Sequence, residues 1–164
     1  MPSLLGALAF LLIPLLGAAP ARADAPPRIA VFDFEMVNTS MLPTTPEEQE
    51  RLRRLGEQLR TTLQQSGKYQ VVDTAPVRAE VTDAGGILKC NGCEQDLARK
   101  LGATELAYGW VQKVSNLILN INVVIAQASD GKQLKGGSVD IRGNTDESWN
   151  RGLKFLLEEH VFND

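Results

Sequence analysis

Hydrophobic and polar residues alternate along three stretches in the C-terminal half of the chain. These stretches cover residues 105–113, 117–128 and 132–142. Alternation with a period of two is typical of β-strands that bury one face. Asp130-Gly131 lies between the last two stretches, and an Asp-Gly pair is typical of tight hairpin turns. With Ser115-Asn116 as the earlier turn, the pattern predicts an antiparallel meander of three strands.

The N-terminal half begins with a run of β-branched and aromatic residues. Residues 29–35 predict a first strand, and residues 69–73 predict a second, shorter one. Residues 37–44 have no period, and we expect a loop there. Because a helical pattern separates the two strands, they should form a parallel pair with a right-handed crossover.

Helix signals follow in three places. Thr45-Pro46-Glu47-Glu48 forms a capping box with proline at the first helical position, and an apolar leucine stripe continues from it to Gly67. Residues 93–101 predict a second helix. Asn144 is the expected N-cap of the last helix, with Glu147 as its capping partner. Residues 75–86 are ambiguous, with room for one helical turn before a Gly-Gly break.

The order of these elements is βα-βα-βββ-α, which predicts a mixed α/β fold. One mixed sheet would carry a C-terminal antiparallel meander, with helices mainly on one face. Residues 24–164 are 141 residues long, a usual length for a single domain. We therefore expect one mixed α/β domain over residues 24–164.

Residues 1–23 read as a secretory signal peptide. Leu4 to Leu16 is almost wholly apolar, and Ala21-Arg22-Ala23 is a small-residue cleavage site. The run is shorter than the ~20 residues that cross a bilayer, so the mature chain from Asp24 should have no membrane span. No cysteine follows the cleavage site to accept a lipid anchor. The expected location is periplasmic or secreted.

The charge of the chain argues against a nucleic-acid partner. The formal net charge is −3 at pH 7. Loss of the leader removes one charged side chain, Arg22, and leaves 16 basic against 20 acidic side chains, a net charge of −4. An acidic protein has no electrostatic attraction to nucleic acid or to anionic lipid.

Cys90-Asn-Gly-Cys93 opens the second predicted helix and allows two interpretations. A helix N-terminus lowers the pKa of a thiol, so the pair could serve thiol–disulfide exchange. The favoured interpretation is a structural disulfide in an oxidising compartment. No metal site is expected, because a zinc site needs two more ligands and His160 is the only histidine. No cofactor is expected either.

Polar side chains recur on the meander and at the start of the last helix. They are Asn120, Asn122, Asp140, Arg142, Asn144 and Asp146. Amides, an arginine and a helix N-terminus together can bind an anion or a polar small molecule. Two alternatives remain: a Ca²⁺ site built from Asp140, Asn144 and Asp146, and an ordinary solvated sheet face.

Catalysis has little support in the sequence. The chain contains no G-x-S-x-G, no H-E-x-x-H and no glycine-rich phosphate loop. His160 is the only candidate imidazole base, and it lies in the last turn of a helix. Asp33 and Glu35 in the first strand point to no reaction. We expect a protein that is not an enzyme.

Five segments of the mature chain resemble an exported bacterial family of domains of unknown function, of the DUF3280/DUF2380 type. The segments are 29–35, 66–73, 90–93, 111–123 and 140–149. At coarser grain the element order is similar to the amino-terminal domain of the Tol-system propeller protein (TolB) and to the curli secretion lipoprotein (CsgG). This likeness implies envelope scaffolding or partner binding.

The sequence-based hypothesis is a non-catalytic periplasmic accessory or binding protein. Its polar Asn/Asp/Arg sheet face would meet a periplasmic protein or a small ligand. The alternative is a periplasmic thiol–disulfide redox protein that uses Cys90 and Cys93.

Overall fold

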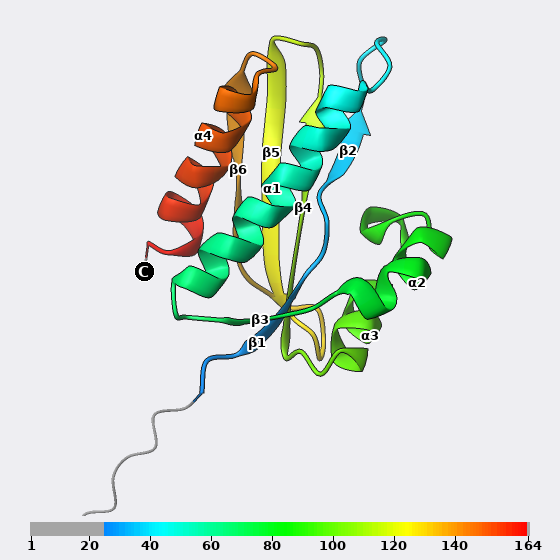
Figure 1. The fold of residues 1–164 in the computed structure, drawn as a ribbon, viewed down its shortest axis with the longest axis vertical. Coiled ribbons are helices and arrows are strands. Elements are labelled where there is room, and N and C mark those ends of the chain that lie inside the picture. The colour runs from blue at the N-terminus through cyan, green and yellow to red at the C-terminus, as the bar shows by residue number, and fades with distance from the viewer. Residues whose placement is uncertain (1–24, 164) are drawn as a thin grey trace, which may run out of the picture.

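A computed structural model describes residues 25–163, in which helices pack against both faces of one six-stranded sheet (Figure 1). The predicted leader lies outside the described residues. The strands are β1 (Arg28–Val31), β2 (Glu35–Asn38), β3 (Gln70–Val72), β4 (Glu105–Lys113), β5 (Ile118–Gln127) and β6 (Gln133–Arg142). The helices are α1 (Pro46–Gln65), α2 (Arg78–Asp83), α3 (Cys93–Lys100) and α4 (Asp146–Leu156). Short turns add η1 (Ala75–Val77), η2 (Ile87–Lys89) and the π-turn η3 (Leu157–Val161).

The sheet has the strand order β3-β1-β4-β5-β6, and β2 pairs with the far half of β4. Strands β1, β3 and β4 are parallel, whereas β4, β5 and β6 form an antiparallel meander. This arrangement confirms the predicted mixed α/β fold. Gly131, in the turn between β5 and β6, has a φ of 73°, the left-handed conformation that glycine adopts at no steric cost.

The predicted first strand is wrong in its extent. It divides into β1 and β2, and β2 takes up part of the segment predicted as loop. Val31 and Glu35 are four positions apart, but their partners Ala107 and Trp110 are only three positions apart along β4. The extra residue bends the chain as a β-bulge does. The sequence pattern could not show this, because the apolar run continues through the break.

The two long helices, α1 and α4, lie side by side on one face of the sheet (Figure 1). The predicted stripes are buried there: Leu52, Leu55, Leu59 and Leu63 on α1, and Trp149, Leu153, Leu156 and Leu157 at the C-terminus. Gly152 permits the close approach of α4, since a Cβ at this position would lie 2.5 Å from Ile141 Cγ2. We call this side the helical face.

The opposite face is only partly covered. Helices α2 and α3 pack there against apolar side chains of β1 and the start of β4, including Ala30, Phe32 and Leu106. The meander strands β4, β5 and β6 extend beyond these two helices (Figure 1). Beyond α2 and α3, the face of β4, β5 and β6 opposite the helical face carries mainly polar side chains.

Caps confirm the start of α1 and correct the start of α4. Thr45 and Glu48 form the predicted reciprocal capping box. The N-cap of α4 is Thr145, whose Oγ1 accepts a hydrogen bond from Ser148 N at 3.2 Å. Asn144, predicted as this cap, instead turns its side chain inward toward α1. Asn and Thr can both cap a helix. Here the Asn144 side chain binds the Glu48 carboxylate, and Thr145 takes the cap position.

Candidate functional site

Three of the predicted site residues meet on the uncovered side of the meander. Asn120 Nδ2 donates to Asp140 Oδ1 at 2.8 Å, and Asn122 Nδ2 donates to Asn120 Oδ1 at 2.6 Å. Ser138 Oγ donates to the same Asn120 oxygen at 3.0 Å. The strand register explains the cluster, because Asn120 lies opposite Asp140, and Asn122 opposite Ser138. Period-two alternation correctly placed these side chains together.

Two aromatic residues extend this surface across β4. Trp110 lies directly opposite Asn122, and the Tyr108 and Trp110 rings stack with centroids 6.3 Å apart. Burial, and to a lesser degree the Glu94 carboxylate, raise the pKa of the Tyr108 phenol above its ordinary value. We call Tyr108, Trp110, Asn120, Asn122, Ser138 and Asp140 the outer sheet face.

The other three predicted residues do not join this cluster. Arg142 is exposed at the end of β6, opposite Ile118. Asn144 and Asp146 belong to the helical side, where Asp146 pairs with Arg51 at 2.7 Å and with Arg54 at 2.9 Å. The six residues are therefore divided between two places. The Ca²⁺ alternative required Asp140, Asn144 and Asp146 side by side, and the structure does not bring them together.

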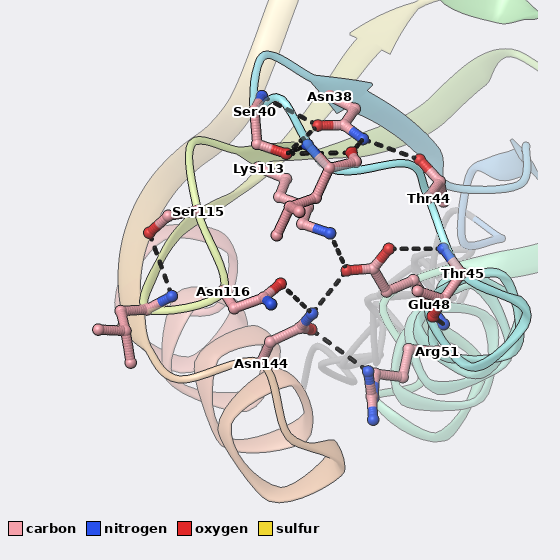
Figure 2. Close-up of polar contacts among 12 residues, drawn as sticks. Asn38, Ser40, Thr44, Thr45, Glu48, Arg51, Lys113, Ser115, Asn116 and Asn144 are labelled. Atoms are coloured by element: carbon pink, nitrogen blue, oxygen red, sulfur yellow. Dashed lines mark hydrogen bonds and ion pairs between the residues drawn. The ribbon is translucent and has the colours of Figure 1, made fainter.

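A buried ion pair is the most unusual polar feature of the helical side (Figure 2). Lys113 Nζ lies 2.6 Å from Glu48 Oε1, and both side chains are 1% exposed. Lys113 points to this side because it follows Val111 in the alternation of β4. Glu48 Oε2 also accepts from Thr45 N at 2.8 Å. One carboxylate thus joins the start of α1 to the end of β4.

Asn144 links the same carboxylate to α4. Its Nδ2 donates to Glu48 Oε1 at 2.6 Å (Figure 2). Its Oδ1 accepts from Trp149 Nε1 at 3.0 Å. The Arg51 guanidinium lies 6.0 Å from the Trp149 ring centroid, within cation–π distance. Among residues 25–163, no buried side-chain nitrogen or oxygen lacks a hydrogen-bond partner. Each buried charge of this network is compensated, which suits a structural role.

Cys90 and Cys93 form a disulfide at the start of α3. Both residues pack against the partly covered sheet face. Glu94 Oε2 lies 3.3 Å from Cys90 Sγ. A neighbouring carboxylate disfavours a thiolate, whereas reactive cysteines have electropositive surroundings. The local charge therefore favours the structural interpretation over the redox alternative.

We expect freshly isolated protein to show no thiol that alkylates without reductant. The disulfide closes a very short loop, so replacing both cysteines by serine should cost less than the ~3 kcal/mol of a longer bridge. Chemical denaturation measures this difference. A reduction potential below the glutathione range would agree with a structural bond, and one close to that of strong thiol oxidants would show a redox function.

The described part of the chain holds no candidate metal centre. No group of three or more His, Cys, Asp or Glu side chains gathers there in a geometry that could hold a metal ion. The ring of His160 packs over Gly137, where a Cβ would lie 2.7 Å from His160 Cγ. No helix in residues 25–163 has the length and apolar character needed to cross a bilayer.

Sequence reasoning missed both Trp110 and Lys113. The alternation of residues 105–113 could have placed Tyr108 and Trp110 on the side opposite Ala107 and Val111, beside Asn122. No sequence signal pairs Lys113 with Glu48, because the two residues are far apart in the chain. The capping box by itself accounts for a glutamate at position 48, so the sequence gives no sign of a second partner for this carboxylate.

The sequence matches the family described as "Protein of unknown function (DUF2380)" over residues 27–161. This match confirms the family resemblance inferred from the five sequence segments. No curated protein matches the chain.

Several solved structures share the fold. The C-terminal domain of LpoB from Escherichia coli is 18% identical with a TM-score of 0.53, covering 77% of this chain and 89% of that one. Lipoprotein GNA1162 from Neisseria meningitidis is 20% identical with a TM-score of 0.52, covering 82% and 92%. The PelC dodecamer from Paraburkholderia phytofirmans is 12% identical with a TM-score of 0.51, covering 81% and 86%. At these identities the likeness concerns the fold alone.

Proposed function

The chain belongs to the family of proteins of unknown function DUF2380, and we propose that it is a non-catalytic accessory protein, periplasmic or secreted, that binds a partner protein through its outer sheet face. The observation that carries this proposal is the stacked, half-buried Tyr108–Trp110 pair beside the Asn122 amide, on the sheet face that α2 and α3 cover only in part. Protein interfaces are enriched in tyrosine and tryptophan and depleted in lysine and glutamate.

The polar part of the outer sheet face is pre-organised for binding. Asn120 Oδ1 accepts from both Asn122 and Ser138, so the amides are oriented before a partner arrives. Within the described residues no group donates to Asn122 Oδ1, which leaves this oxygen for a partner's N–H. Side chains that are already ordered lose less conformational entropy on association. A rigid sheet with oriented amides is therefore a favourable surface for recognition.

The proposed location has two supports. The first is the leader predicted over residues 1–23 from its apolar run and the small residues at its end. The second is the fold, which this chain shares with a lipoprotein from Neisseria meningitidis.

The test is retention of periplasmic proteins on immobilised chain, with the Trp110→Ala variant. We expect Trp110→Ala to reduce the amount of a specifically retained protein at least tenfold. Interface tryptophans often contribute 2 kcal/mol or more, which is roughly thirtyfold in affinity. The matched control is Phe155→Ala, since Phe155 is an exposed aromatic on α4. Equal retention by the Trp110→Ala variant and wild type, or loss with Phe155→Ala alone, would contradict the proposal.

Tryptophan fluorescence provides a second measurement. The chain has two tryptophans, and Trp149 is fully buried. Acrylamide quenching of the half-buried Trp110 should therefore dominate the signal, and the retained protein should suppress it. Unchanged quenching in the complex would place the contact elsewhere.

A further inference from the structure

A cleft of about 520 Å³ opens at the carboxyl end of β1, away from the outer sheet face. Its walls come from the bend between β1 and β2, the first half of α1, the end of β3 and the α2–η2 segment. This volume lies within the range of small-molecule sites, roughly 300–1,000 Å³. The cleft is thus large enough for a small organic ligand.

The chain topology places this cleft at a switch point of the sheet. Strands β3 and β4 are the parallel neighbours of β1, one on each side. The β1-to-β3 connection is α1 on the helical face, whereas the β3-to-β4 connection runs through α2 and α3 on the opposite face. Open α/β sheets bind ligands outside the carboxyl ends of their strands where such crossovers diverge.

The carboxylates of the cleft already have partners. Asp33 forms an ion pair with Arg60, whose Nε also donates to the Val31 carbonyl at 3.3 Å. Glu35 accepts the backbone N–H groups of Ile87 and Leu88 and so fixes η2 against β2. Neither carboxylate therefore depends on a ligand for its compensation.

The cations of the cleft differ in this respect. Arg78 and Lys89 both line the cleft, and neither side chain has a hydrogen-bond or ion-pair partner within residues 25–163. Buried apolar side chains form the inner wall: Phe34, Leu52 and Ile87. An apolar interior with two unpaired cations at its edge fits a ligand with an apolar body and an acidic group.

We propose that this cleft binds a small amphipathic organic anion, with its apolar body against Phe34, Leu52 and Ile87 and its acidic group held by Arg78 and Lys89. The probe is anilinonaphthalenesulfonate, compared with N-phenylnaphthylamine, which has the same rings without the sulfonate. We expect the sulfonate to bind with 1:1 stoichiometry in isothermal titration. The Arg78→Gln/Lys89→Gln variant should weaken the sulfonate at least tenfold and the neutral probe less than twofold.

Two further variants locate the bound probe. Thr82→Trp adds a large ring at the cleft, where Thr82 is exposed on α2, and should abolish binding. Lys132→Gln removes an exposed cation outside the cleft and should leave the affinity within twofold. Dodecanoate and N-acetylphenylalanine then compete for the probe, so that the stronger competitor distinguishes a fatty-acid source from a peptide terminus. Binding that survives Thr82→Trp, disappears with Trp110→Ala, or is equally weakened by Lys132→Gln would overturn the proposal.

Discussion

Replacing Lys113 by methionine is expected to lower the free energy of unfolding by about 3–5 kcal/mol, because it leaves a buried carboxylate without its cation. Glu48 and Lys113 are both 1% exposed, so water cannot replace the lost partner. The hydrogen bonds from Thr45 and Asn144 remain, but they do not neutralise the charge. Urea denaturation measures the loss.

A double-mutant cycle with Glu48→Gln separates the pair from its surroundings. The Glu48→Gln/Lys113→Met protein buries no charge, so it should recover about 2–3 kcal/mol of the summed losses. The matched control is Arg151→Met, which breaks an exposed ion pair with Glu147 at 3.2 Å. This control should remain within about 0.5 kcal/mol of wild type. Additive losses in the cycle would contradict a buried, coupled pair.

The Glu48–Lys113 pair also predicts how the stability of the fold changes at low pH. Burial of Glu48 acts to raise its pKa, but hydrogen bonds from Lys113, the Thr45 amide and Asn144 outweigh burial and hold the pKa below the ordinary 4.5. A carboxyl with a lowered folded-state pKa stabilises the fold above its unfolded pKa, and the contribution disappears as the pH falls toward the folded value. Below pH 4.5 wild type should therefore lose stability more steeply than the Glu48→Gln/Lys113→Met protein.

The sequence predicted those elements whose pattern is local. Alternation placed the meander strands within one or two residues of their ends, and the Thr45 capping box located the start of α1. These features depend on neighbours in the chain, namely turn residues, caps and periodic apolar positions. Such local preferences agree with the final fold in most of this protein, as expected of a foldable sequence.

The features that the sequence did not reveal depend on contacts between distant segments. The break between β1 and β2 follows from pairing with β4, where Gly109 accommodates the Phe34 ring; a Cβ there would lie 2.4 Å from Phe34 Cε1. Asn144 looked like a cap and instead serves the Glu48 carboxylate. The predicted site residues are divided between two places because the chain crosses from the outer sheet face to the helical face after Arg142.

Replacing Ile121 by alanine is expected to cost about 2–5 kcal/mol, through lost burial and the cavity left behind. Ile121 is fully buried between the sheet and α4, and a Cβ on Gly152 would lie only 3.1 Å from its Cδ1. Because Gly152 has no side chain, it cannot fill the cavity that Ile121→Ala leaves. Ile121→Val should cost only about 0.5–1.5 kcal/mol.

The neighbouring outer residues are the controls for this substitution. Asn122 follows Ile121 but points to the outer sheet face, and Arg142 is exposed at the end of β6. Asn122→Ala and Arg142→Ala should each remain within about 0.5 kcal/mol of wild type. A loss for Asn122→Ala comparable to that for Ile121→Ala would show that the amide cluster holds the sheet together. Unchanged stability together with weaker retention of the partner would show that the Asn122 amide acts in recognition. The core would then be sufficient to fix the strand that presents this amide.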